Sequence, residues 1–142
     1  MTIASLIAGR DQTIISCGPD DSVFDAARLL AEKRIGALPV TEGDEVVGIF
    51  SERDLLYCVA KTGAEALTKP IREVMTSPAI MIAPEVKALE ALSLMTRRRI
   101  RHLPVVDRGR LVAFVSIGDI VKYRVDRVEA EASQLRDYIR TA

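Results

Sequence analysis

The chain has 142 residues, which suits one compact domain or two small units that share a core, and 49% of them are hydrophobic. Twenty basic side chains balance twenty acidic ones and tryptophan is absent, so the basic excess and the aromatic stacking surface typical of nucleic-acid binders are missing. No apolar run approaches the roughly 20 residues of a membrane span, and the first residues do not resemble a signal peptide. We therefore expect a cytoplasmic protein without a membrane partner, and the composition disfavours nucleic-acid binding.

The first 60 residues predict a strand, a helix, two strands and a second helix. Residues 13–16 are β-rich, and Asp20 or Asp21 is suited to cap the helix that follows them. Apolar residues recur through that helix with the spacing of one buried stripe, and Gly36 is expected to end it. The members of the stripe are Val23, Ala26, Ala27 and Leu30.

Two further strands and a capped helix complete this unit. Residues 37–40 and 46–50 predict strands on either side of a polar turn over residues 42–45. Ser51 is suited to cap a helix over residues 54–60. Residues 61–73 are mostly polar, contain Gly and Pro, and are expected to link this unit to a second one through a short helical turn over residues 71–76.

The second unit repeats the first. Residues 15–56 align with residues 80–121 without a gap, and unrelated segments of this length would share only about three identities by composition. The sequence therefore predicts two copies of one fold, a first repeat over residues 1–60 and a second over residues 74–124, related by a pseudo-twofold axis. Twelve aligned pairs are identical: Ile15/Ile80, Pro19/Pro84, Ala26/Ala91, Leu29/Leu94, Arg34/Arg99, Ile35/Ile100, Leu38/Leu103, Pro39/Pro104, Val40/Val105, Val47/Val112, Ser51/Ser116 and Asp54/Asp119.

Residues 125–142 predict a C-terminal amphipathic helix. Apolar residues from Val121 to Ile139 are spaced by four and three in alternation, as in a heptad seam, and charged residues flank them. Three interpretations stay open. The helix packs on its own domain, it packs on a second subunit, or it docks a specific partner protein.

The segment Gly48–Asp54 contains the strongest candidate for a binding site. Its Ser-x-x-Asp pattern stands where a strand ends and a helix begins, and it recurs as Ser116–Asp119. Helix N-termini favour anions, and a carboxylate there can accept hydrogen bonds from ribose hydroxyls. A capping box is the alternative explanation for a single copy. We expect Gly48 to let a ligand approach the backbone closely.

These motifs, in this order and twice over, resemble the tandem pair of CBS domains known as a Bateman module. The resemblance covers residues 13–121 and rests on the two Leu-Pro-Val strands and the two Ser-x-x-Asp turns. It implies an α+β fold of two β-α-β-β-α repeats with facing sheets and outward helices, followed by the C-terminal helix. It also implies a regulatory module that binds an adenine nucleotide such as AMP, ATP, NAD or NADH between the repeats, and a homodimer with an unidentified protein effector.

The resemblance implies two pockets, each built from both repeats. Pocket one would use the Ser-x-x-Asp turn of the first repeat, and pocket two that of the second. The residues of pocket one are Ile49, Phe50, Ser51, Glu52, Arg53, Asp54, Ile80, Ile100, Arg101 and His102, and those of pocket two are Ile15, Ile35, Gly36, Ala37, Phe114, Val115, Ser116, Gly118 and Asp119.

The two implied pockets differ in charge. Arg101 and His102 stand where the first repeat has Gly36 and Ala37, so pocket one is expected to prefer a phosphorylated ligand. Pocket two would lack both groups, and Ala113 replaces its motif glycine, which leaves its occupancy open. Glu52 would limit the number of phosphates, which favours AMP or a dinucleotide over ATP.

Three other classes of function compete with ligand sensing. Binding of RNA or DNA is a minor one, which the neutral charge disfavours and the arginine-rich run over residues 97–101 keeps open. An enzyme is disfavoured because no Cys–His or Ser–His pair lies in the duplicated motifs, so no catalytic residue is assigned. No metal site is expected either, since Cys17, Cys58 and the single His102 lack metal-ligand spacing. An interaction or dimerisation scaffold with degenerate pockets is the main alternative.

Overall fold

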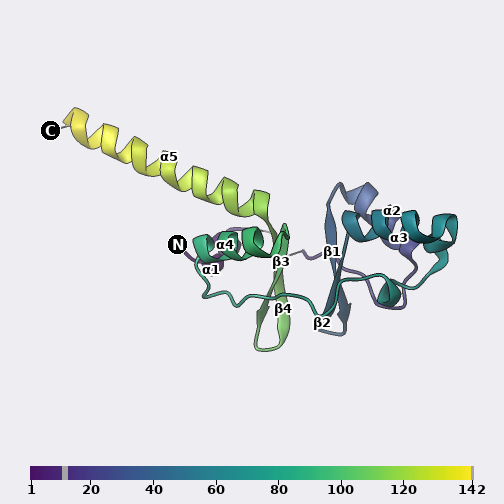
Figure 1. Cartoon of the computed structure of the whole chain (residues 1–142). Coiled ribbons are helices and arrows are strands. Elements are labelled where there is room, and N and C mark those ends of the chain that lie inside the picture. Colours follow the sequence, from purple (N-terminus) through teal and green to yellow (C-terminus); the bar gives the residue numbers. More distant parts are fainter. Residues whose placement is uncertain (11–12, 142) are drawn as a thin grey trace.

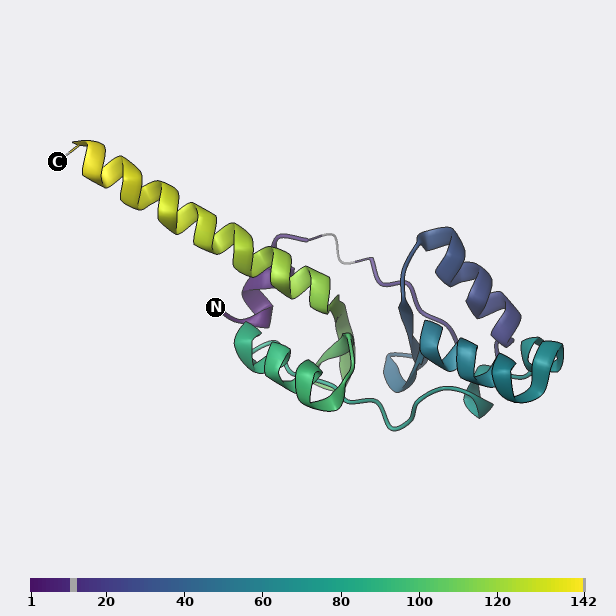
Figure 2. The same ribbon diagram turned by 45° about the horizontal axis from the view of Figure 1, so that its top comes forward.

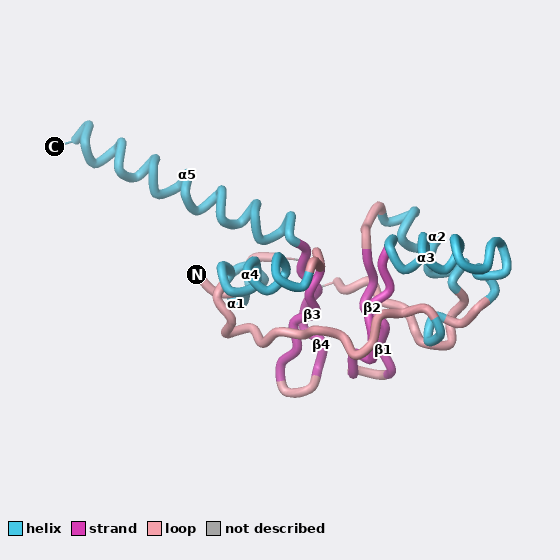
Figure 3. The backbone as a smooth tube through the Cα atoms, viewed as in Figure 1, coloured by secondary structure: helices cyan, strands magenta, loops and turns pink. Residues whose placement is uncertain are grey.

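The structure, a computed structural model, describes residues 1–10 and 13–141. Two similar units stand side by side, with their sheets facing each other in the middle and their helices outward (Figures 1 and 3). The predicted α+β pair of repeats is confirmed. The first unit contains α2 (Val23–Lys33), β1 (Ala37–Glu42), β2 (Glu45–Ser51) and α3 (Glu52–Thr62), and the second contains α4 (Ala88–Arg98), β3 (His102–Asp107), β4 (Arg110–Ser116) and α5 (Ile117–Thr141).

Each unit has a two-stranded antiparallel sheet with the same register. Leu38 pairs with Phe50 in the first sheet, and Leu103 pairs with Val115 in the second. The expected strand over residues 13–16 is wrong, because that segment pairs with no strand. Only Cys17 reaches the sheet: it donates its N–H to the Pro39 carbonyl over 3.1 Å and makes a single parallel bridge to Val40.

The ends of α2 differ from the prediction. Ser22, and neither Asp20 nor Asp21, caps the helix by accepting the N–H of Asp25 over 3.1 Å. The carboxylate of Asp21 instead accepts the N–H of Gly18. The helix ends at Arg34, which adopts the left-handed conformation with φ 54°, so Gly36 lies beyond the helix end. Arg99 ends α4 in the same way, with φ 55°.

The segment that precedes each repeat in the sequence docks on the other repeat. The N-terminal helix α1 (Ile3–Ala8) docks on the second repeat, where the Ile3 N–H donates to the Val86 carbonyl over 2.8 Å. The 3₁₀ turn η2 (Ile71–Glu73) docks on the first repeat, where the Ile71 N–H donates to the Asp21 carbonyl over 2.8 Å. This turn lies within the predicted helical turn, and a second one, η1 (Gly63–Thr68), precedes it.

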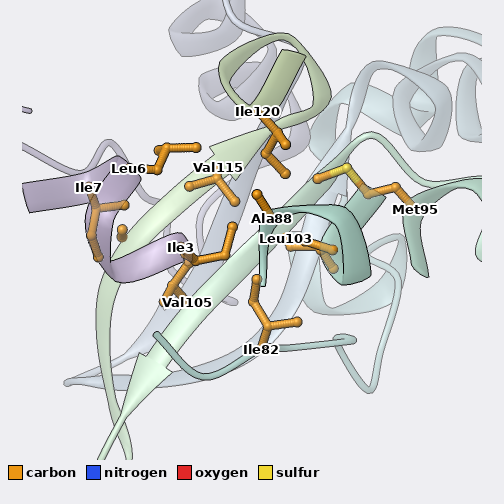
Figure 4. Close-up of a cluster of buried hydrophobic side chains, with 12 residues drawn as sticks. Ile3, Leu6, Ile7, Ile82, Ala88, Met95, Leu103, Val105, Val115 and Ile120 are labelled. Carbon is orange, nitrogen blue, oxygen red and sulfur yellow. The ribbon is translucent and has the colours of Figure 1, made fainter. Parts of the chain in front are cut away.

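The two repeats have separate apolar cores. In Figure 4 the side chains of Ile3 and Leu6 from α1 point into the same cluster as Leu103, Val115 and Ile120 of the second repeat. The first-repeat core includes Ile71 from η2 in the corresponding place. The swapped segments therefore contribute buried side chains to both cores, in addition to backbone hydrogen bonds.

Only the first turns of α5 pack on the body of the protein. Ile120 is fully buried and Tyr123 packs against the second core, but Val125, Val128 and Leu135 are 46%, 51% and 60% exposed. Figures 1 and 2 show the helix projecting away from both repeats. The interpretation that this helix packs along its own domain is therefore wrong. Among the described helices, none has the length and apolar character needed to cross a membrane.

Candidate functional site

The two Ser-x-x-Asp turns have nearly the same geometry. Ser51 donates its N–H to Asp54 Oδ2 over 2.9 Å, and Asp54 donates its N–H to Ser51 Oγ over 3.3 Å. The matching distances between Ser116 and Asp119 are 2.8 and 3.1 Å. These reciprocal bonds are a capping box, and they hold each carboxylate at the N-terminus of a helix, α3 or α5.

Each turn borders a cavity between the repeats. Cavity A, of about 230 Å³, is bordered by Ser51 and Asp54 together with Ile80, Ile100 and Arg101 of the other repeat. Cavity B, of about 370 Å³, is bordered by Ser116 and Asp119 together with Ile15 and Ile35 of the other repeat. Residues of both copies therefore meet at each cavity, in the arrangement that the duplicated motifs suggested.

Most of the candidate residues line these cavities, and three do not. Phe50 and Val115 are fully buried in the two cores, so their side chains belong to the fold and not to the cavities. Gly118 lies in the first turn of α5, outside the residues that line either cavity. The candidates at cavity A are Ile49, Ser51, Glu52, Arg53, Asp54, Ile80, Ile100, Arg101 and His102, and those at cavity B are Ile15, Ile35, Gly36, Ala37, Phe114, Ser116 and Asp119.

Several lining residues were missed from the sequence. Arg34 borders cavity B and its counterpart Arg99 borders cavity A, and their identity in the two repeats was a signal that could have found them. Arg10 of cavity B and Thr76 of cavity A lie outside the aligned segments, residues 15–56 and 80–121. The other missed residues are Ile7, Thr13 and Ile14 at cavity B, and Tyr57, Pro78 and Ala79 at cavity A.

The expected charge difference between the pockets holds for Arg101, which borders cavity A and not cavity B, and is wrong for His102. His102 borders both cavities, as do Gly36 and Ala37, because all three lie where the cavities adjoin. Cavity B also has its own cation close to the motif carboxylate, since Arg10 Nη1 lies 3.5 Å from Asp119 Oδ2. Arg10 precedes the duplicated region, so a comparison of the two copies could not reveal it.

His102 is the titratable group shared by the two cavities. Burial, and then the charge of Arg101, lower its pKa below the usual value of 6.5, while Asp119 and Glu52 act in the opposite direction. Its ring stacks on Phe114 with the ring centroids 5.5 Å apart. The imidazole is therefore mainly neutral at pH 7 and is held in place by an aromatic neighbour.

The role expected for Gly48 is also corrected. A Cβ at this position would lie 2.6 Å from Met75 Sδ and 3.0 Å from the Thr76 carbonyl oxygen. The close approach is therefore made by the connection between the repeats, which pairs with β2 through two hydrogen bonds between Ile49 and Thr76. Ala113, the counterpart of Gly48, is accommodated in the second repeat at the edge of cavity B.

The described residues offer no group of His, Cys, Asp and Glu side chains that could hold a metal ion. Cys17 is buried, and burial followed by the charge of Asp21 raises the pKa of its thiol to about 11. A thiol in this state is a poor nucleophile and a poor metal ligand near neutral pH.

Solved structures of related proteins share this architecture. The CBS-domain containing protein ATU1752 from Agrobacterium tumefaciens is 36% identical with a TM-score of 0.83, and the match covers 87% of this chain and 99% of that one. The crystal structure of CBSX2 in complex with AMP is 28% identical with a TM-score of 0.76, covering 88% of this chain and 96% of that one.

Curated relatives include longer proteins. The mitochondrial CBS domain-containing protein CBSX3 of Arabidopsis thaliana is 35% identical over 134 residues, which are 91% of this chain and 65% of that protein. Inosine-5'-monophosphate dehydrogenase of Mycobacterium tuberculosis is 38% identical over 118 residues, but the match spans only 21% of that enzyme. The CBS-domain family model matches residues 11–61 and again residues 71–126. With its duplicated turns and facing sheets, this chain belongs to the CBS-domain family and contains a tandem pair of these domains.

Proposed function

We propose that this chain is a regulatory module that binds an adenosyl ligand between its two repeats and does not itself catalyse a reaction. The observation that carries the proposal is the pair of cavities in which a Ser-x-x-Asp turn of one repeat faces the Ile and Arg side chains of the other. The AMP complex of the related protein CBSX2 supports the choice of ligand class.

The side chains of cavity A suit the three parts of a nucleotide. The Asp54 carboxylate stands at a helix N-terminus, where it can accept hydrogen bonds from ribose hydroxyls. Ile80 and Ile100 offer apolar contacts for a base, and Arg99 and Arg101 supply positive charge for a phosphate. In this proposal cavity B binds in the same manner, with Asp119 at the ribose and Arg34 and Arg10 as cations.

The size of the cavities favours a mononucleotide. Volumes of about 230 and 370 Å³ lie at or below the small end of the range of ligand pockets, roughly 300–1,000 Å³. Arg101 Nη2 lies 3.8 Å from Glu52 Oε1, so part of its charge is already balanced in cavity A. Both features favour AMP over ATP, with NAD and NADH as the alternatives to be tested.

Regulation would arise from a difference in affinity. A ligand shifts an equilibrium between two arrangements of the repeats only as far as it binds them with different free energies. A second copy of the chain and an effector protein are the partners that we propose to respond to that shift.

Thermal unfolding of ligand-stripped protein against AMP, ADP, ATP, NAD, NADH and S-adenosylmethionine tests the proposal. A ligand present at a hundred times its Kd adds about 2.7 kcal/mol to the free energy of unfolding, which raises Tm by several degrees. Asp54→Ala and Asp119→Ala together should abolish the shift, and each variant is compared with its own ligand-free Tm because the capping boxes are also lost. Asp107→Ala, at the exposed end of β3, is the matched control.

A flat panel would favour the alternative function, a scaffold with degenerate pockets. The exposed apolar stripe of α5 is the observation that supports a scaffold. Nucleotide turnover by the purified chain, lost in Asp54→Ala, would instead indicate an enzyme.

A further inference from the structure

The apolar stripe of α5 is the largest feature that ligand binding leaves unexplained. It runs along the part of the helix that projects from the body, and no described segment of the chain covers it (Figures 1 and 2). The stripe contains Val121, Val125, Val128, Ala132, Leu135 and Ile139, of which all but Ala132 are exposed.

The spacing of the stripe matches the seam of a two-stranded coiled coil. Val125, Ala132 and Ile139 fall on one core position of the heptad, and Val121, Val128 and Leu135 fall on the other. The helix has 25 residues, which corresponds to a length of about 37 Å. This gives six successive apolar seam positions, and β-branched residues occupy two of the three positions in each set. The seam therefore predicts association of helices without fixing the number of strands, and the flanking charges are the feature that fits a pair.

The charged residues beside the seam favour one orientation of the partner helix. In a parallel, in-register pair, Arg124 of one helix would face Glu129 of the other, and Glu131 would face Arg136. Both contacts join opposite charges, and in a twofold-symmetric dimer each contact occurs twice.

The antiparallel arrangement with full overlap of the seam is disfavoured by the same residues. Glu129 would then face its own copy, Glu131 would do the same, and Lys122 would face Arg136. All of these contacts join like charges, which oppose association.

We propose that α5 associates with α5 of a second copy of this chain as a parallel, in-register coiled coil. The proposal does not depend on the nucleotide, so its test and that of ligand binding fail independently. None of the seam residues lines either cavity, so the seam and the cavities use different residues.

Sedimentation equilibrium of the full chain tests the association. The wild-type chain should be dimeric at micromolar concentration, and Leu135→Asp should weaken the dimer by about a hundredfold or more because it places a charge in the seam. Ala130→Asp, on the outer face of the same helix, is the control and should leave the dimer unchanged. A monomeric wild-type chain, or a dimer unaffected by Leu135→Asp, would overturn the proposal.

Charge reversal tests the orientation. Glu129→Arg should weaken the dimer by about tenfold or more, since it faces Arg124 in the parallel pair, and Arg124→Glu combined with Glu129→Arg should restore it. In the antiparallel pair the combined variant would still place two arginines together and would not recover. Failure of the combined variant to recover contradicts the parallel register.

A disulfide provides a second measure of orientation. Leu135→Cys should form a disulfide with its own copy in the parallel pair, because the two side chains meet in the seam, whereas Ala130→Cys should not. The native Cys17 and Cys58 are buried and do not compete in the folded protein. Absence of the Leu135→Cys disulfide under oxidising conditions argues against the parallel seam.

Discussion

Thr76 Oγ1 donates a hydrogen bond to Asp54 Oδ1 over 3.0 Å, which ties the connection between the repeats to the carboxylate that we place at the ribose. The same carboxylate accepts the N–H of Ser51 through its other oxygen. Both oxygens of Asp54 are therefore oriented before any ligand arrives, which lowers the cost of ordering the site on binding.

Thr76→Val should weaken AMP binding to cavity A several-fold, because it removes the donor that orients Asp54 and keeps the side-chain volume. The stability cost should stay below about 1 kcal/mol, since the hydroxyl is exposed. Isothermal titration calorimetry measures the affinity. Thr68→Val is the control, because the Thr68 hydroxyl donates to the Glu65 carbonyl away from both cavities. Unchanged affinity in Thr76→Val would show that Asp54 needs no such orientation.

Gly48→Ala should destabilise the first repeat by about 1–3 kcal/mol, because the added methyl group would collide with Met75 and with the backbone at Thr76. Chemical denaturation measures the free energy of unfolding. Ala113→Gly at the matching place of the second repeat removes a methyl group that is accommodated there, and it should cost only about 1 kcal/mol or less. Equal costs at the two positions would contradict the difference between the repeats.

Ile3→Ala should cost about 2–5 kcal/mol although Ile3 lies near the start of the chain, because its side chain is fully buried in the second core. Hydrogen exchange should show the loss of protection mainly in β3, β4 and α4. Ala4→Gly, on the exposed face of α1, is the control for helix propensity alone. Loss of protection confined to the first repeat would contradict the swapped docking of α1.

Stability should fall in acid partly because of His102. Its pKa in the folded protein is lower than 6.5, so the unfolded chain binds the proton more readily. The contribution of His102 to the free energy of unfolding is complete above pH 6.5. It is lost as the pH falls below 6.5 toward the lowered pKa of the folded protein. The free energy of unfolding of His102→Gln, measured between pH 8 and 5, should therefore fall less than that of the wild type. Parallel curves would show that His102 titrates alike in both states.

Much of the site followed from the repeated pattern. The Ser-x-x-Asp turns were predicted because a capping box is local, so its two partners lie three residues apart in the sequence. The meeting of Ile80 and Ile100 with the turn of the first repeat was an implication of the resemblance to tandem CBS domains, and the lining of cavity A agrees with it. Phe50 and Val115 were misplaced because alternation along a strand sends neighbouring side chains to opposite faces.

The remaining errors concern contacts between distant segments. Arg10 meets Asp119, Thr76 meets Asp54, and Met75 occupies the space beside Gly48, and none of these pairs shares a local pattern that a sequence could display. The exchange of α1 and η2 between the repeats has the same cause, because it depends on which apolar surface lies nearest after the chain has folded.

By itself, the sequence determined that this protein has two copies of one α+β unit, because apolar spacing and helix caps act over a few residues and both copies display them. Only the tertiary structure decided which cations border each cavity, that His102 is shared by both, and that α5 leaves its seam exposed. The physical reason is that burial, charge and exposure at these positions depend on neighbours brought together from far along the chain.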